Sequence, residues 1–436
     1  MSGASTAGPP QPSRRRLALV VLVLGAGLGL WFSPTVYTTT PGATTHTTAQ
    51  SSPAPAAAAP SAPAGPAALA LNSWSAQLQT VAPLETARVQ VLRDGRVIDD
   101  FPLAGGGDVS YTDYLLWPAT NYSYEIRAVD QGGRTLRDEV VALTTPPQSG
   151  SFPLLYSPDS FWNRPIVPDA SVDPNSAAIV SKTLVRYGKT ASLATGDDWG
   201  RPLAFAHTTS TPYEVHCTRF DCDTSVFFRI PRYARPNTGS DHHLVVVDPS
   251  SNRELDMWLA TYNPKTDLWS SGGRYITDAA GWGAVCAPGV HCNGAVAAGF
   301  AAFGGIVRPE EIAQGHIDHA LFLTEPFTRK EYAACPATHT DGISDDSAAI
   351  PEGARIQLDP AFNVDAQPWP RWERIIAHAL QTYGAYVGDT GGTLGFLGEA
   401  TLDRGYDAWS KAGMPRGTSL ANLPWASFRV MRLQRC

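Results

Sequence analysis

The chain has 436 residues, of which 43% are hydrophobic and 17% are charged, and its formal net charge at pH 7 is −7. This balance is typical of globular domains, and the length predicts two or three of them. No segment has the basic stripe that a nucleic-acid surface needs, so we expect no nucleic-acid partner.

Residues 1–36 predict a cytoplasmic tail followed by a signal or anchor helix. Arg14, Arg15 and Arg16 precede an apolar run from Leu17 to Phe32. Because positive charge stays on the cytoplasmic side, everything downstream is expected outside the cell membrane. The run is short for a span, and no clear cleavage site follows it, so a retained single-pass anchor and a cleaved secretory signal are both open.

Residues 37–66 predict a disordered stalk. They are rich in Thr, Ala, Ser and Pro and have almost no charged or large apolar side chains. Such a segment cannot bury a core, so we expect it to be extended and to hold the following domains away from the membrane.

Residues 67–147 predict a small β-sandwich made of short alternating strands, with Asp94-Gly95 as a typical two-residue hairpin turn. The segment LWPATNY, which ends at Tyr122, resembles the tyrosine corner of fibronectin type III modules, where the tyrosine hydroxyl bonds to nearby backbone. The tryptophan expected on the second strand of such modules is not obvious, because Trp74 comes too early. The resemblance implies a spacer or adhesion module without catalysis of its own.

Residues 151–436 predict one large β-rich domain. Strand patterns occur in SVFFRIP, HHLVVVD, RELDMWLATY, HIDHALFLT and RIQLD, and the clearest helix patterns are RPEEIAQG and WERIIAHALQTYG. Many strands with a few short helices are typical of a jelly-roll-like β-sandwich, and a barrel is the alternative. The fold class that we expect for the whole chain is therefore mainly β.

Most of residues 158–392 resembles a widespread group of exported bacterial proteins. The resemblance rests on the segments SFWNRPI, DPNSAAIV, GFAAFGGIVRPEEIAQGHIDHALFL, CPATHTDG and IIAHALQTYGAYVGDTGG. The group has no assigned chemistry. The resemblance therefore implies that these motifs belong to one folded unit, and it implies no substrate.

The six cysteines agree with export, because disulfides form in oxidising compartments. A zinc site would favour C-x-x-C pairs, which the sequence lacks. Other connectivities stay open, but the most local pairing joins Cys217 to Cys222, Cys286 to Cys292 and Cys335 to Cys436.

The stretch DHHLVVVDPSSNRELDMW predicts a hairpin whose turn is flanked by Asp248 and Arg253. In this register the side chains on one face are nearly all apolar, as burial requires. We expect the opposite, non-core face to collect His243, Glu254, Asp256 and Trp258.

An indole beside carboxylates and an imidazole is the set of groups that sugar chemistry uses. The carboxylates of Glu254 and Asp256 would act as general acid and as nucleophile or base, with help from His243, while Trp258 would stack on a sugar ring. In a lyase, a histidine would instead take the proton. The plainer alternative is that the two acids are only the solvated side of the hairpin.

Four further residues are candidates for the same site. His319 lies among aliphatic residues, where it is either an acid–base group or a buried structural histidine. His339 lies in a turn-rich loop near a cysteine and could assist catalysis, or the loop could be a plain surface turn. Arg355 could bind a sugar carboxylate or a structural acid, and Asp389 could line a cleft or belong to an ordinary turn.

Several other chemistries lack their motifs. The sequence contains no G-x-S-x-G, P-loop or H-E-x-x-H pattern, and adjacent His242 and His243 do not fit a cupin-like metal site, so we expect no metal and no cofactor. We expect an extracytoplasmic carbohydrate-active protein, with a glycoside hydrolase first, and a polysaccharide lyase or a non-enzymatic glycan-binding or adhesion protein as alternatives. Its expected partners are a polysaccharide or cell-wall glycan, and the membrane.

Overall fold

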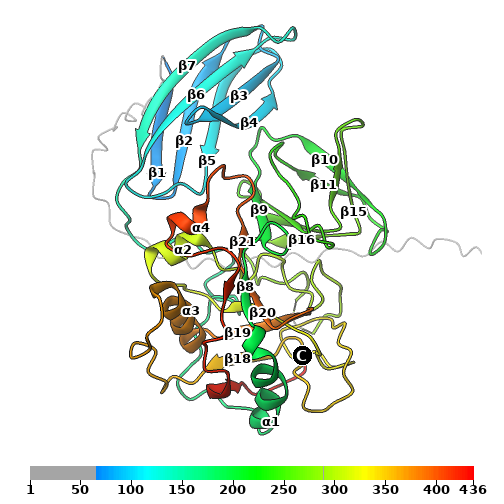
Figure 1. The fold of residues 1–436 in the computed structure, drawn as a ribbon. Coiled ribbons are helices and arrows are strands. Elements are labelled where there is room, and N and C mark those ends of the chain that lie inside the picture. The colour runs from blue at the N-terminus through cyan, green and yellow to red at the C-terminus, as the bar shows by residue number, and fades with distance from the viewer. Residues whose placement is uncertain (1–64, 288) are drawn as a thin grey trace, which may run out of the picture. The chain divides into compact units, whose positions relative to one another are not determined.

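The computed structural model describes residues 65–287 and 289–436, and Figure 1 shows its elements. The expected anchor helix in residues 1–36 and nearly all of the expected stalk in residues 37–66 lie outside these residues. Within the described stretches, no helix has the length and apolar character that a membrane span requires.

The first folded unit is a sandwich of a three-stranded sheet, ordered β1-β2-β5, and a four-stranded sheet, ordered β4-β3-β6-β7 (Figure 1). Its strands are β1 (Ala67–Asn72), β2 (Ser75–Ala82), β3 (Arg88–Arg93), β4 (Arg96–Pro102), β5 (Gly107–Asp113), β6 (Asn121–Val129) and β7 (Thr135–Thr144). The neighbouring strands in both sheets are antiparallel.

The details of this sandwich are those of a fibronectin type III module. The hydroxyl of Tyr122 accepts a hydrogen bond of 2.8 Å from the backbone N–H of Trp117, so the expected tyrosine corner is confirmed. Asp94 and Gly95 both have positive φ, 51° and 78°, as a two-residue hairpin turn of this type requires. Buried side chains from both sheets, including Val89 and Phe101, fill the space between them.

The large domain contains three mixed sheets. The five-stranded sheet has the order β16 (Gly273–Asp278), β13 (Arg253–Trp258), β12 (Leu244–Asp248), β9 (Arg201–Phe205) and β21 (Glu399–Ala400). The seven-stranded sheet has the order β22 (Thr418–Ser419), β8 (Ser192–Ala194), β20 (Gly395–Leu397), β17 (Leu321–Glu325), β19 (Ala385–Thr390), β18 (Arg355–Leu358) and β23 (Phe428–Val430). The four-stranded sheet has the order β11 (Val226–Arg229), β10 (Pro212–Cys217), β15 (Leu268–Ser271) and β14 (Thr261–Asn263).

Short helices complete this domain. The α-helices are α1 (Ser176–Val180), α2 (Pro309–Gln314), α3 (Arg371–Thr382) and α4 (Ala408–Lys411). A π-helical turn at Ser181–Val185 follows α1, and 3₁₀ turns lie at Gly188–Thr190 and Trp425–Ser427. The expected class, mainly β with a few short helices, is confirmed.

The detailed topology differs from that of a jelly roll, which is built from antiparallel strands. Parallel neighbours are β9 with β12, β9 with β21, β10 with β15, β17 with β19, and β8 with β20. Parallel pairing needs long crossover connections, and the strand patterns along the sequence do not reveal which distant strands these connections bring together.

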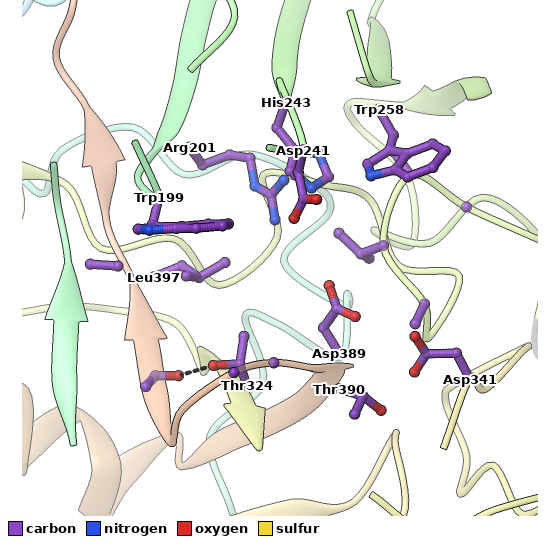
Figure 2. Close-up of a pocket in the computed structure, with 18 of the residues that line it drawn as sticks. Trp199, Arg201, Asp241, His243, Trp258, Thr324, Asp341, Asp389, Thr390 and Leu397 are labelled. Atoms are coloured by element: carbon purple, nitrogen blue, oxygen red, sulfur yellow. Dashed lines mark hydrogen bonds between the residues drawn. The ribbon is translucent and has the colours of Figure 1, made fainter. Parts of the chain in front are cut away.

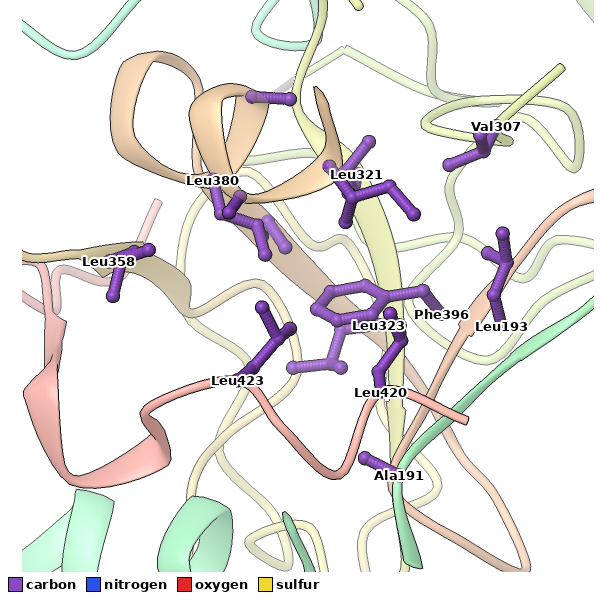
Figure 3. Packing of buried hydrophobic residues seen from close by; sticks show 14 of the residues in the cluster. Ala191, Leu193, Val307, Leu321, Leu323, Leu358, Leu380, Phe396, Leu420 and Leu423 are labelled. Atoms are coloured by element: carbon purple, nitrogen blue, oxygen red, sulfur yellow. The ribbon is translucent and has the colours of Figure 1, made fainter. Parts of the chain in front are cut away.

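The main core of the large domain lies between α3 and the seven-stranded sheet. Figure 3 shows Leu380 of α3 among Leu321, Leu323 and Phe396, which come from β17 and β20. Each such side chain stabilises the fold by about 1.5–3 kcal/mol through burial. Past the end of α3, Gly384 has a φ of +69°, and a Cβ there would lie 2.1 Å from the carbonyl oxygen of Ile356. Only glycine therefore fits between α3 and β19.

The register expected for the central hairpin is confirmed, since Val245 pairs with Asp256 and Val247 with Glu254. The expected non-core face is wrong, because Glu254 and Asp256 are both 0% exposed. Apolar clusters cover both faces of the five-stranded sheet. The alternation of residue types shows which side chains share a face, and it does not show that a distant segment covers that face.

All three disulfides follow the most local pairing. Cys217 with Cys222 and Cys286 with Cys292 close short loops. Cys335 with Cys436 spans 101 residues and ties the last residue of the chain to the loop that carries His339. This bond constrains the unfolded chain far more than the two short loops do.

Candidate functional site

A cleft of about 870 Å³ lies where strands of the five-stranded and seven-stranded sheets begin or end. Figure 2 shows Arg201, Asp241 and His243 on one side of it and Asp389, Thr390 and Asp341 on the other. The first group comes from the edge formed by β9 and β12, and the second from the end of β19 and a neighbouring loop. Polar side chains from distant parts of the chain therefore meet in one hollow.

Asn237 joins two of the segments that form the cleft wall. Its side-chain N–H donates to the carbonyl oxygen of Gly200 at 3.0 Å, and its side-chain oxygen accepts the backbone N–H of His243 at 3.0 Å. Its backbone N–H also donates to the carbonyl oxygen of His243 at 2.9 Å. Asn237 is buried and can make these bonds without competition from water, so it fixes the start of β9 relative to the start of β12.

Arg201 brings a positive charge into the wall of the cleft. Its side chain is 3% exposed, and its Nε and Nη1 have no hydrogen-bond partner among the described residues. Burial lowers the pKa of Arg201 to about 10, against the opposing effect of the negative charges of Asp389, Asp256 and Asp241. The guanidinium is therefore still charged at neutral pH, and Arg201 lines the cleft.

His243 is neutral in this setting. Burial holds the pKa of its imidazole well below the usual range, and the charge of Arg201 lowers this pKa further. The Nδ1 atom has no hydrogen-bond partner among the residues that the structure describes. A histidine with so low a pKa is a weak base near neutral pH, which disfavours it as the proton acceptor of a lyase.

Three carboxyl groups lie together at the opposite wall, where Asp341 and Asp389 line the cleft and the buried Glu352 lies behind them. Asp341, Glu352 and Asp389 each place a carboxylate oxygen within 4.8 Å of the other two. Burial raises the pKa of Asp389 to about 7, with the charge of Asp341 as the next cause. Burial, together with a hydrogen bond to Asp341, holds the pKa of Glu352 well above its usual range. Glu352 therefore keeps its proton to higher pH than a free carboxyl does, and Asp389 is protonated in a large share of molecules near neutral pH.

These carboxyl groups are also the hard oxygen donors that Ca²⁺ takes in proteins. Three carboxylates this close together cannot all be ionised without compensation. Protons on Glu352 and Asp389 reduce the repulsion between the negative charges. A divalent cation held by the same oxygens would also reduce it.

Aromatic side chains flank the acidic and basic groups. Trp199 lines the cleft with 51% of its surface exposed, and the half-buried Trp258 lines it from the end of β13. The ring of Phe220 lies 5.8 Å from that of Trp258, and the guanidinium of Arg219 lies 5.6 Å over the Trp258 ring. An exposed indole face beside polar groups suits the C–H face of a ring-shaped ligand.

The structure brings half of the residues singled out by the sequence into the cleft. His243, His339, Trp258 and Asp389 line it, whereas the remaining four do not: Glu254, Asp256, His319 and Arg355.

The two acids of the hairpin lie in the interior. The Ala302 N–H donates to Asp256 at 3.0 Å, and the Phe303 N–H donates to Glu254 at 3.2 Å. The hydroxyl of Tyr156 also donates to Glu254, at 2.7 Å. Burial raises the pKa of both carboxyls, so these acids are hydrogen-bonded core groups with no access to a ligand in the cleft.

His319 and Arg355 also make contacts away from the cleft. The Nε2 of His319 lies 2.9 Å from a carboxylate oxygen of Glu311, and its Nδ1 lies 2.8 Å from the carbonyl oxygen of Ala320. Arg355 donates to the carbonyl oxygens of Tyr383 and Arg164, at 2.9 Å and 2.5 Å. Both side chains hold neighbouring segments together in this structure.

Sequence patterns do not single out Arg201, Asp241 or Glu352. Asp241 precedes β12, so the alternation that assigns faces to β12 does not include it. One usable signal is the polar run Asp241-His242-His243 directly before a buried apolar strand, because polar groups at strand ends often line clefts. Nothing around Arg201 in the sequence marks it.

The chain matches no family of known proteins and no curated protein. Among solved structures it is similar to the sixth fibronectin type III domain of human fibronectin type III domain containing protein 3, at 25% identity, over 22% of this chain and 96% of that one, with a TM-score of 0.17. It is also similar to fibronectin(III)-like modules of Clostridium thermocellum CbhA, at 19% identity, over 20% of this chain and 95% of that one, with a TM-score of 0.17.

A third similar structure is the Yersinia enterocolitica family 28 exopolygalacturonase. The identity is 14% and the TM-score is 0.17, and the match covers 20% of this chain and 21% of that one. The chain thus matches only about a fifth of that enzyme, whose activity is not transferred by the match. None of these similarities bears on the large domain.

Proposed function

We propose that the chain is an extracytoplasmic enzyme that hydrolyses a glycosidic bond of a polysaccharide in the cleft. The observation that carries the proposal is Asp389, a half-buried carboxyl in the cleft wall whose pKa is raised to about 7 by burial. A glycosidase needs one carboxyl that still holds its proton near neutral pH. The catalytic role expected for Asp256 and Glu254 thus passes to acids that a substrate can reach.

Asp389 would donate its proton to the leaving oxygen, and Asp341 would supply the negative charge that attacks or stabilises the anomeric carbon. Their carboxylate oxygens approach within 4.8 Å, which is close to the separation of about 5–5.5 Å in retaining glycosidases. Glu352, whose pKa is raised well above its usual range by burial and by a hydrogen bond to Asp341, lies beside this pair.

The aromatic side chains would bind the sugar rings. Trp199 and Trp258 both line the cleft and expose part of their indole rings to it. Stacking of this kind serves a hydrolase and a non-enzymatic glycan-binding protein equally well, so the two Trp residues alone do not separate these functions.

The proposed location outside the cytoplasm is supported by the three disulfides, which form and persist in oxidising compartments. The basic and apolar pattern of residues 14–32 supports a membrane anchor or export signal. In this proposal the fibronectin type III module is a spacer that carries the enzyme domain, and a cell-wall glycan is the partner.

The experiment is a screen of the full chain on a panel of polysaccharides, with reducing ends and unsaturated products measured together. Release of saturated reducing ends supports the hydrolase. Unsaturated products would contradict it in favour of a lyase. Binding without any product, lost in Trp258→Ala, would instead identify a glycan-binding protein.

A further inference from the structure

Arg201 is unusual among the buried arginines that the structure describes. The guanidinium of Arg404 contacts the carboxylates of Glu310 and Glu399, and that of Arg274 donates to backbone carbonyl oxygens. The guanidinium of Arg308 lies 3.6 Å from Glu399 and over two aromatic rings. Each of these three arginines also has at least one nitrogen without a hydrogen-bond acceptor, but each forms a hydrogen bond or an ion pair. Arg201 is just as buried, and among the described residues its guanidinium has neither: Nε and Nη1 are buried without an acceptor, and no ion pair forms.

Burying charged donors without acceptors is unfavourable, so the arrangement needs a physical explanation. Arg201 lines the cleft, and Figure 2 shows its guanidinium directed toward the space between the two walls. A ligand in this space would bring acceptors to the guanidinium. The planar guanidinium matches a carboxylate best, because two parallel N–H···O bonds can form at once.

The charges around Arg201 are compatible with a bound carboxylate. Its acidic neighbours are Asp241 and Asp389 in the cleft wall and the interior pair Glu254 and Asp256. The pKa values of Asp389, Glu254 and Asp256 are raised, so these three groups carry less negative charge near neutral pH than three fully ionised carboxylates would. His243, the other basic side chain beside Arg201, is neutral.

We infer that Arg201 binds the carboxylate of an acidic sugar, so that the substrate class is a polysaccharide containing uronic acids. Trp199 lies two residues before Arg201 and lines the same cleft, so its indole can pack on the ring whose carboxylate reaches the guanidinium. The inference rests on the proposed function for the sugar and for its cleavage, whereas recognition of the carboxylate requires no turnover.

The test measures binding of uronate oligosaccharides to the full chain by calorimetry. The probes are oligogalacturonate, oligoglucuronate and an alginate oligosaccharide, each compared with its methyl-esterified form, which has the same ring without the charge. We expect at least one acid form to bind at least tenfold more tightly than its ester, as a charge-assisted hydrogen bond predicts. Arg201→Gln should abolish this preference, with binding of the acid form weakened about 10- to 100-fold.

Two further variants make the test specific. Arg432→Gln removes an exposed positive charge that does not line the cleft and should change binding by less than about fivefold, because exposed charges contribute little. Arg201→Lys keeps the charge without the planar fork, and should recover only part of the preference. It also provides the comparison if Arg201→Gln does not fold, as judged by its thermal unfolding.

The outcomes separate this inference from the proposed function. A carboxylate preference that depends on Arg201, without any cleavage, would support the inference and contradict the hydrolase. Cleavage of neutral glycans with equal binding of acid and ester forms would support the hydrolase and overturn the inference. The inference is also overturned if no acid probe binds the wild-type chain, or if Arg201→Gln keeps the preference.

Discussion

Two aspartates of the large domain differ in what surrounds them rather than in their own chemistry. Burial raises the pKa of both Asp256 and Asp389. Asp256 is enclosed and accepts a backbone N–H from Ala302, whereas Asp389 is half-buried and faces the cleft. A protonated carboxyl can act as a general acid only where a substrate reaches it, which is why the proposed mechanism gives that role to Asp389 and not to Asp256.

The pH dependence of hydrolysis tests this assignment. Asp389 must be protonated to donate, and its pKa is raised to about 7, so the active form is complete below that pH and is lost as pH rises through it. We expect kcat/KM to fall above about pH 7, by about tenfold per pH unit. A rate that stays constant or rises well into the alkaline range would contradict the role of Asp389.

Glu352 allows a separate test through stability. Its pKa in the folded state is raised by burial, so the folded chain holds the Glu352 proton more tightly than the unfolded chain does. The free energy of unfolding therefore decreases as pH rises toward and through the folded-state pKa of Glu352. Glu352→Gln cannot ionise, and should become more stable than the wild type as pH rises from about 5 to about 9. The measurement is chemical unfolding at both pH values. Glu331→Gln, at an exposed site, should show no such change.

At the scale of elements, the central hairpin shows which structural features can be predicted from the sequence and which cannot. The turn and the alternation of residue types were enough to predict that Val245 opposes Asp256. The covering of that face could not be predicted, because it depends on residues 301–303, which lie far along the chain. A local pattern determines the register of a strand pair, whereas burial depends on contacts that are distant in sequence.

Asn237 is the residue through which β9 and β12 hold their relative position. Asn237→Ala removes two side-chain hydrogen bonds, to Gly200 and His243, and should lower the free energy of unfolding by about 1–3 kcal/mol. Because Arg201 and His243 would then shift, kcat/KM should fall more than tenfold. Asn175→Ala, at an exposed position whose side chain makes no capping hydrogen bond, is the control and should change stability by less than about 0.5 kcal/mol. Unchanged turnover in Asn237→Ala would rule out its positioning role.

At the scale of the whole molecule, the sequence predicted the fibronectin type III module and the mainly β class, and it favoured the two short-range cysteine pairs while leaving the full connectivity open. Each of these depends on short-range signals, such as a turn, a corner motif or nearby cysteines. The cleft could not be predicted in the same way. Arg201, Asp341 and Asp389 span nearly two hundred residues and meet only because distant strands join in the mixed sheets.

The bond between Cys335 and Cys436 should contribute more to stability than the other disulfides do. It closes a span of 101 residues and lies near the loop of His339 and Asp341. Replacing both cysteines by alanine should cost about 2–5 kcal/mol in the free energy of unfolding. The same change at Cys217 and Cys222, which are five residues apart, should cost less. Equal losses in denaturant unfolding would contradict this ranking.

The most direct test of the account compares two asparagine substitutions on whichever glycan the screen identifies. Asp389→Asn should lower kcat by about 10²- to 10⁴-fold while the glycan still binds. Asp256→Asn, in the interior, should fold and keep kcat within about tenfold of the wild type, since Asp256 does not line the cleft. Wild-type kcat in the Asp389→Asn variant would contradict the account.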